Sequence, residues 1–176
     1  MEDDRENVSF NVLRNALYHT ARRLTFDRWN RWASALVILL GAAAVADFFL
    51  RFGIETVYLS IAVTMVGTLQ LVFDFGGRAR DHQALQRDYY NLLAEIEEKP
   101  DANAADIAAW RARMTRIAGD EPPTLRAIDA KAYNDAFDAL EFGEEGDRLV
   151  IPWWHRLAGQ VLTFEGYRYL KRSEIE

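Results

Sequence analysis

Two apolar stretches decide the fold of this chain: ASALVILLGAAAVADFFL at residues 33–50 and TVYLSIAVTMVGTLQLVF at residues 56–73. The first contains one charge, Asp47, and the second contains none. As a helix, a stretch of about 18 residues is about 27 Å long, which is close to the hydrocarbon thickness of a bilayer. The polar connection, residues 51–55, is long enough only for a tight turn. The pattern therefore predicts an α-helical hairpin that crosses a membrane.

The two stretches admit one other interpretation, in which both helices form the buried core of a soluble bundle. Core helices of soluble proteins are usually shorter and carry a polar face, so the sequence favours the membrane hairpin. The chain of 176 residues lacks cysteine, which excludes disulfides and thiolate metal sites. We divide it into an N-terminal juxtamembrane helix (1–32), the transmembrane hairpin (33–73), a cytosolic helical domain (74–148) and an aromatic C-terminal docking or interfacial helix (149–176).

Arginines on both sides of the hairpin indicate its orientation, because Lys and Arg are retained on the cytoplasmic side of a membrane. Both termini are therefore expected in the cytoplasm. The chain begins with acidic residues 2–4, unlike a secretory signal, so the first stretch is expected to act as an uncleaved anchor. The turn contains one arginine, Arg51. The flanking arginines are Arg22, Arg23, Arg28 and Arg31 before the hairpin, and Arg78, Arg80 and Arg87 after it.

The rest of the sequence shows helical spacing of apolar residues, which predicts an all-α fold. A cytosolic helix is expected over residues 8–31. Asp101 or Asn103 can cap a later helix that stops at Gly119. Further helices are expected over residues 78–98, 104–118 and 123–140, and from Pro152 onward.

No catalytic motif stands out in the sequence. The three histidines, His19, His82 and His155, lie far apart in sequence without metal-ligand spacing, and the common hydrolase, protease and phosphate-loop motifs are missing. We therefore expect no enzymatic activity, no cofactor and no metal site. His82 is interpreted either as a pH sensor or as a surface or packing histidine. The net charge of −6, with its acidity in the middle of the chain, does not favour direct nucleic-acid binding.

Small and hydroxylated residues recur every three or four positions along the second apolar stretch. Ser60, Thr64, Gly67 and Thr68 therefore share one helix face. Such a face serves either close helix packing, with hydroxyls bonding across, or the lining of a water-filled path. A single hairpin cannot enclose a pore, so lining requires a ring of subunits.

Two further polar residues lie near the ends of the apolar stretches. Asp47 either pairs with Arg51, four residues further on, or contributes to a carboxylate ring that would favour cations. Gln70, near the inner end of the second stretch, could face the same polar path.

Short motifs surround the hairpin in a characteristic order. They are Arg22-Arg23 before it, Phe73-Asp74 after it, then Arg80, His82, Leu85, Tyr89 and Leu92, then Asp120-Glu121-Pro122-Pro123, and then Asp129, Ala132 and Asn134. In this order they resemble the SLATT family, whose two-span hairpin occurs in bacterial conflict systems. The resemblance covers about residues 22–134 and leaves the segment after Asp147 unmatched.

The resemblance implies a membrane effector of a bacterial antiviral system. Such proteins are thought to oligomerise in the inner membrane and permeabilise it when triggered, which kills or arrests the infected cell (abortive infection). Its expected partners are other copies of the chain, the lipid bilayer, and a regulatory protein or nucleotide signal from a neighbouring gene. The alternative is a membrane anchor or scaffold that recruits a cytosolic partner without forming a pore.

On the effector hypothesis, residues after the hairpin connect the membrane part to the cytosolic part and hold subunits together. Gly76 and Gly77 are the expected hinge, because two glycines weaken a helix by about 1 kcal/mol each. An alternative role for the polar candidates is capping and ion pairing within one chain. These candidates for subunit contacts are Asp74, Arg80, Tyr89, Asp129 and Asn134.

Overall fold

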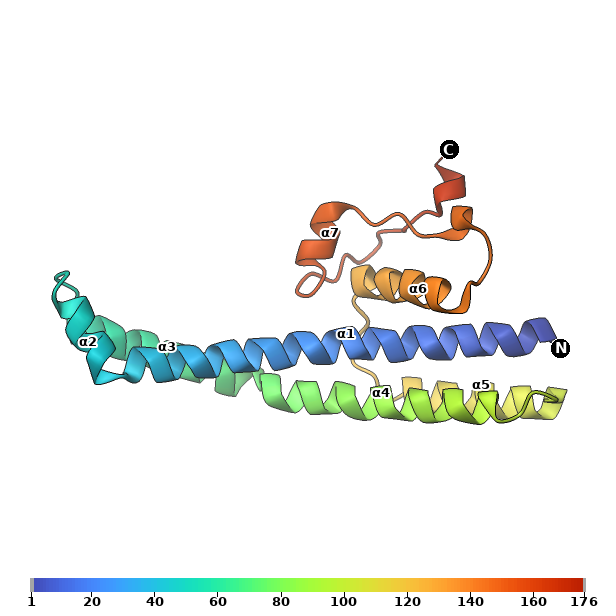
Figure 1. The fold of residues 1–176 in the computed structure, drawn as a ribbon, viewed down its shortest axis with the longest axis horizontal. Coiled ribbons are helices and arrows are strands. Elements are labelled where there is room, and N and C mark those ends of the chain that lie inside the picture. Colours follow the sequence, from blue (N-terminus) through green and yellow to red (C-terminus); the bar gives the residue numbers. More distant parts are fainter. Residues whose placement is uncertain (1, 176) are drawn as a thin grey trace. The chain divides into compact units, whose positions relative to one another are not determined.

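The computed structural model describes residues 2–175, except for the side chains of residues 2, 43 and 44, and this part of the chain forms helices without a β-strand. The all-α fold predicted from the apolar spacing is therefore confirmed. Figure 1 shows the order of the elements. They are α1 (Glu2–Gly41), α2 (Ala43–Leu50), α3 (Thr56–Phe73), α4 (Phe75–Glu97), α5 (Ala104–Ala118), α6 (Arg126–Leu140), the short 3-10 helix η1 (Glu145–Asp147), α7 (Trp153–Ala158) and the 3-10 helix η2 (Arg172–Glu174).

The chain divides into two compact units. Unit 1 contains the residues up to Arg22 together with those from His82 onward, and unit 2 is Arg23–Asp81. Helices α1 and α4 each contribute residues to both units. Of the segment 1–32, expected as a separate juxtamembrane helix, the part up to Arg22 thus folds with the later helices, and the rest belongs to unit 2.

The core of unit 1 is built around the N-terminal part of α1. Positions three or four apart share a helix face, and α1 carries two such apolar faces. One face, including Val12, packs with Leu92 of α4 and Trp110 of α5 in a buried cluster. The other face, including Phe10, packs against Phe137 of α6. Within unit 1, α1 therefore lies between α6 on one side and α4 with α5 on the other (Figure 1).

Local capping sets the ends of α5. The Asn103 side chain accepts hydrogen bonds from the backbone N–H groups of Ala105 (2.8 Å) and Asp106 (3.1 Å). The Asp106 carboxylate in turn accepts from the Asn103 backbone N–H at 2.9 Å, which completes a capping box. Gly119 is the C-terminal cap. Both predicted ends of this helix are confirmed, with Asn103 rather than Asp101 as the cap.

Helix α6 begins three residues later than its sequence suggests. We expected it to start at Pro123, but its N-terminal cap is Leu125. The Leu125 N–H donates a 3.0 Å hydrogen bond to the Tyr18 hydroxyl of α1, so a tertiary contact replaces the expected first turn.

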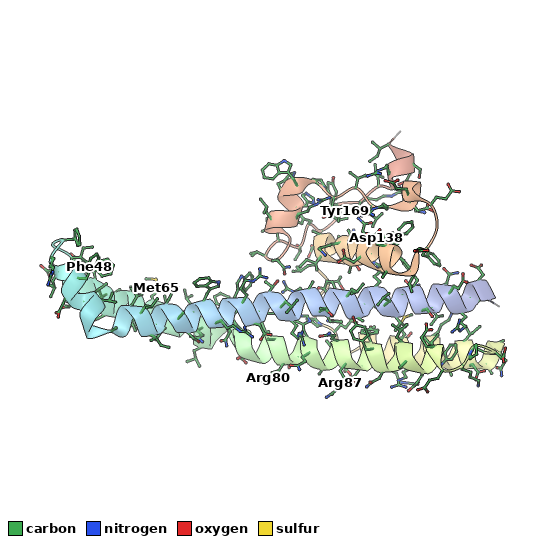
Figure 2. The ribbon with its side chains drawn as sticks, viewed as in Figure 1. Phe48, Met65, Arg80, Arg87, Asp138 and Tyr169 are labelled. Atoms are coloured by element: carbon green, nitrogen blue, oxygen red, sulfur yellow. The ribbon has the colours of Figure 1, made fainter. Side chains whose placement is uncertain are left out.

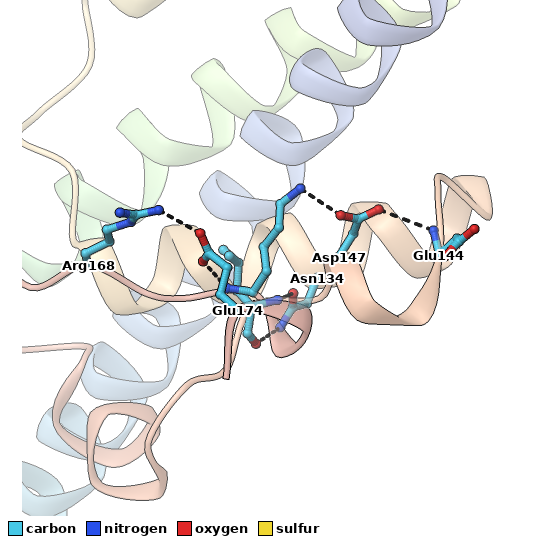
Figure 3. A network of polar contacts seen from close by, with 7 residues as sticks. Asn134, Glu144, Asp147, Arg168 and Glu174 are labelled. Atoms are coloured by element: carbon cyan, nitrogen blue, oxygen red, sulfur yellow. Dashed lines mark hydrogen bonds and ion pairs between the residues drawn. The ribbon is translucent and has the colours of Figure 1, made fainter. Parts of the chain in front are cut away.

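The C-terminal segment, residues 149–175, is less helical than its aromatic pattern suggests. Helix α7 covers only Trp153–Ala158, and an isolated antiparallel bridge joins Leu149 to Lys171. Figure 3 shows the polar network that holds this segment. The Lys171 ammonium contacts the Asp147 carboxylate at 2.7 Å, and Arg168 donates to Glu174 at 2.8 Å. The helix that we expected from Pro152 onward is therefore short, and ion pairs hold much of the remaining segment.

Unit 2 contains the helical hairpin formed by α2 and α3 with the C-terminal part of α1. The first apolar stretch is not one helix, because the backbone at Ala42 is extended (φ −74°, ψ 129°) and separates α1 from α2. Gly41 directly precedes this break, and glycine weakens a helix by about 1 kcal/mol. The second stretch, in contrast, forms α3 over its full length.

Candidate functional sites

The apolar side chains of α3 are largely exposed in the structure. Leu59 is buried, whereas Leu71 is 82% exposed. Met65, which Figure 2 labels, is 58% exposed. By length and composition, one helical run among the described residues, Thr56–Glu97, could cross a membrane, and 6% of its most apolar window is buried. Among the described residues, the second stretch alone thus forms a helix long and apolar enough to cross a membrane, because the break at Ala42 divides the first.

The hydroxyl groups of α3 also point away from the rest of unit 2. Ser60, Thr64 and Thr68 are exposed. The Ser60 hydroxyl donates to the Thr56 carbonyl at 3.1 Å, and the Thr64 hydroxyl donates to the Ser60 carbonyl at 2.8 Å. A Cβ added at Gly67 would meet no atom within 4 Å, so packing inside the hairpin does not require this glycine. The face is therefore open to contacts outside the chain.

Gln70 has a different environment from these hydroxyls. Its amide nitrogen donates to the Asn30 side-chain oxygen at 3.0 Å and to the Ser34 hydroxyl at 2.9 Å, both on α1. The three side chains form a partly buried polar clamp inside unit 2. Gln70 thus joins α3 to α1, and the structure does not bring it together with the exposed hydroxyl face.

Asp47 lies exposed on α2. An ion pair with Arg51 was one of its two interpretations, but no such pair forms within the described part of the chain. Asp47 lies on α2, whereas the candidate hydroxyls lie on α3.

The expected hinge glycines, Gly76 and Gly77, lie inside α4. The backbone break lies at Asp74, directly before this helix. Asp74 adopts a left-handed conformation (φ 40°, ψ 56°) between α3 and α4. Its carboxylate accepts a 2.9 Å hydrogen bond from the Gly77 N–H and so caps α4. A Cβ at Gly77 would lie 2.6 Å from the Asp74 Cγ, whereas one at Gly76 would make ordinary contacts with Arg80 at 3.5 Å. Gly77 therefore makes room for the cap.

The other candidates for subunit contacts are mostly engaged within the chain. Asp129 pairs with Arg14 of α1 through two hydrogen bonds, one of them at 2.8 Å. Asn134 is buried, and its amide donates to the Leu149 carbonyl at 2.9 Å and accepts from the Leu149 N–H at 2.8 Å (Figure 3). Arg80 is exposed on α4 (Figure 2).

A buried histidine pair lies in unit 1, although its two members are 63 residues apart in sequence. His19 of α1 is 0% exposed and His82 of α4 is 4% exposed. Their Nδ1 atoms are 2.8 Å apart, which is hydrogen-bond distance. The Tyr89 ring stacks on His19 with centroids 5.7 Å apart. The pair therefore joins α1 to α4 inside the core.

A carboxylate completes this cluster from the connection between α5 and α6. The His19 Nε2 atom lies 3.1 Å from a Glu121 carboxylate oxygen, and the Tyr89 hydroxyl donates to the same oxygen. Burial alone would raise the pKa of the Glu121 carboxyl, but the contacts with His19 and Tyr89 outweigh it and lower this pKa. Burial and the hydrogen bond to Glu121 raise the pKa of the Tyr89 hydroxyl. The carboxylate is thus ionised and the tyrosine protonated at neutral pH.

Sequence reasoning missed this cluster because it judged the histidines by their spacing along the chain. A usable signal was present in the apolar stripes of the two helices. His19 continues the α1 stripe of Val12 and Ala16, and His82 starts the α4 stripe of Leu85 and Tyr89. A histidine on such a stripe is expected in the core.

His155, the third histidine, is also buried, but it lies in α7 and has other neighbours. Its Nδ1 atom is 2.6 Å from the Tyr169 hydroxyl, and the Phe164 ring stacks on it with centroids 3.8 Å apart. On the outer side of α7, Trp153 and Leu157 remain exposed. The aromatic segment thus docks through one side and leaves the other open.

Within residues 2–175, side chains suited to metal binding do not gather in a group of three or more. Comparisons with known proteins give no match to a family model, to a curated protein or to a solved structure. The arguments for function therefore come from the geometry described above.

Proposed function

We propose that this chain is a membrane effector of a bacterial antiviral system, which oligomerises in the inner membrane and permeabilises it when triggered. The exposed apolar surface of α3 carries the proposal. Leu71, Val72 and Ile61 are each more than half exposed. Water disfavours such a surface, whereas lipid favours it. The backbone groups of α3 are hydrogen-bonded within the helix, as the bilayer core requires.

The proposed topology is a hairpin over residues 33–73 with both termini in the cytoplasm. Its inner ends carry the arginines, among them Arg31 before the first stretch and Arg78 after the second. The first crossing consists of two helical pieces that meet at Ala42. A broken helix is tolerated at membrane depth where protein or a water-filled cavity surrounds the break.

The exposed face of Ser60, Thr64, Gly67 and Thr68 supports assembly through α3. Glycine and small hydroxylated residues let helix backbones approach closely in a membrane. Since unit 2 itself does not use this face, another copy of the chain is the proposed occupant. The resemblance to SLATT proteins supports the permeabilising role and a trigger supplied by a neighbouring gene.

Dye release from liposomes by the purified full-length chain tests this function. We expect the wild-type protein to release dye and to have an oligomeric mass in detergent. Thr64→Leu should reduce the release rate at least tenfold, because it removes a hydroxyl and adds bulk on the proposed face. Met65→Leu, on an adjacent exposed position, is the matched control and should leak like the wild type. Equal leakage by both variants would overturn the role of this face.

The runner-up function is a membrane scaffold that recruits a cytosolic partner. One observation favours it. The Ser60 and Thr64 hydroxyls already donate hydrogen bonds to backbone carbonyls of their own helix, so these groups do not need a water-filled path as a hydrogen-bond acceptor. A scaffold would insert into liposomes, as shown by co-flotation, but would release no dye even when the product of the neighbouring gene is added.

A further inference from the structure

We propose that His19, His82 and Glu121 form a proton-operated latch that holds α1 and α4 together in unit 1. The three side chains come from α1, α4 and the connection before α6, and both histidines are buried. The contact distances are 2.8 Å between the two Nδ1 atoms and 3.1 Å between His19 Nε2 and the carboxylate. The latch is thus a chain of three groups across the core.

The facing nitrogens set how many protons the latch can hold. One proton between the two Nδ1 atoms makes a hydrogen bond, with one histidine as donor and the other as acceptor. A His19 that carries both ring protons can donate to His82 on one side and to Glu121 on the other. A second proton at the Nδ1 pair would place two N–H groups head to head 2.8 Å apart, and also two positive charges when both Nε2 atoms carry protons. Inside the core, little solvent screens that repulsion.

The other charged or titratable groups around the pair do not change charge in the same pH range. The Tyr18 ring of α1 packs against both histidine rings, and Arg22 of α1 and Asp129 of α6 act electrostatically on Tyr18. Burial raises the pKa of Tyr18, so this hydroxyl stays protonated. Arginine remains charged in proteins. The carboxyl of Glu121, whose pKa is lowered, stays ionised in mild acid.

Histidine is the side chain whose charge ordinarily changes between about pH 5 and 8, which makes the pair the acid-sensitive part of the proposed latch. The geometry of the pair sets the direction of the pH response. At neutral pH the pair shares at most one proton and the latch is closed. As the pH falls, the second proton enters, the Nδ1–Nδ1 hydrogen bond is lost, and α1 separates from α4 at this level.

Opening of the latch has a consequence for permeabilisation, and this part rests on the proposed function. Both α1 and α4 continue into unit 2, which contains the hairpin. A change in the contact between α1 and α4 in unit 1 therefore acts on the same two helices that continue into the proposed membrane segment. We infer that acidification of the cytoplasm favours the open, leaking state.

Hydrogen exchange of the full-length chain in detergent micelles tests the latch directly. Exchange is measured at pH 7.5 and 5.5 and corrected for the intrinsic pH dependence of the amide rates. In the wild type we expect the protection of α1 around residue 19 and of α4 around residue 82 to fall at least tenfold at pH 5.5. In His82→Asn, which retains a polar group near the Nδ1 position but cannot be protonated, the change should be less than twofold.

His155→Gln is the matched control, because it removes a buried, hydrogen-bonded histidine outside the latch. It should keep the pH response of the wild type. Should His82→Asn fail to fold, His19→Asn replaces it. A wild type without a pH response, or a response retained in the asparagine variants, would overturn the latch.

Dye release at the same two pH values separates this inference from the proposed function. Release that is equal at pH 7.5 and 5.5 would refute the coupling to acid while leaving the permeabilising function intact. No release at either pH, with the exchange response present, would refute the permeabilising function and leave the latch intact.

Discussion

The N-terminal part of α1 in unit 1 and α3 in unit 2 are both rich in apolar residues, but the structure uses them in opposite ways. In unit 1, Val12 and Leu92 are 0% exposed and belong to a packed core. In unit 2, Leu71 and most of its neighbours on α3 face outward. Apolar content alone therefore does not distinguish a helix that is buried in a core from one whose apolar side chains stay exposed. The position of polar residues does.

In unit 1, polar residues lie both at the edge of the apolar core and inside it. The ion pair of Arg14 with Asp129 lies at its edge, and the histidine pair lies inside it. On α3 the hydroxyls turn outward and bond their own helix. The contrast shows that unit 1 encloses its apolar side chains, whereas α3 leaves most of its apolar side chains uncovered, which is the surface that the proposed function assigns to lipid or other copies.

The largest expected difference between the two units comes from truncating leucines. Leu92→Ala in α4 leaves a cavity in the buried cluster and should lower the free energy of unfolding by about 2–5 kcal/mol. Leu71→Ala on α3 removes an exposed side chain and should change it by less than about 0.5 kcal/mol. Denaturant unfolding in detergent micelles, followed by circular dichroism, measures both.

Equal losses from the two leucine variants would contradict the comparison. They would mean that α3 is packed in the protein as measured, as a tight oligomer would require. Repeating the measurement at a tenfold lower protein-to-detergent ratio separates these cases, because a stability that depends on association falls on dilution.

Sequence reasoning predicted the fold where local signals decide it. Apolar spacing predicts the helices, and Asn103 and Gly119 fix the ends of α5 because their chemistry acts within a few residues. It failed where a distant contact decides. The start of α6 depends on the Tyr18 hydroxyl, more than 100 residues away in sequence, and no local pattern indicates that bond.

The candidate sites divide in the same way. The face of Ser60 and Thr64 could be predicted, since one helix period defines it. The latch could not be predicted as a unit, because His19, His82 and Glu121 meet only once three elements pack. The break between α3 and α4 shows an intermediate case: the glycines indicated the region, and the Asp74 cap decided the position.

Substitutions at the neighbouring Gly76 and Gly77 test the Asp74 cap, and their expected effect is intermediate in size. Gly76→Ala meets only ordinary contacts and should stabilise α4 by about 0.5–1 kcal/mol, because alanine favours a helix. Gly77→Ala displaces the Asp74 carboxylate and should be about 1–2 kcal/mol less stable than Gly76→Ala. Thermal unfolding in micelles compares the two directly.

If both alanine variants were stabilised alike, the Asp74 cap would contribute nothing, and the left-handed residue alone would set the break. Asp74→Ala in the Gly77→Ala background checks this point. With the cap already lost, the second substitution should add little to the loss of stability.

The smallest expected effect concerns the polar clamp inside unit 2, where Gln70 bonds Ser34 across the hairpin. Hydrogen bonds between membrane helices contribute about 0.6 kcal/mol on average, because the separated helices also find polar partners. We expect a double-mutant cycle of Gln70→Leu and Ser34→Ala to give a coupling energy of about that size. Thr68→Val, which alters an exposed hydroxyl on the same helix, should show no coupling to Ser34→Ala. A coupling of about 2 kcal/mol or more for the clamp would mean that the hairpin has an interior like that of unit 1, and the contrast between the units would then rest on the outer face of α3 alone.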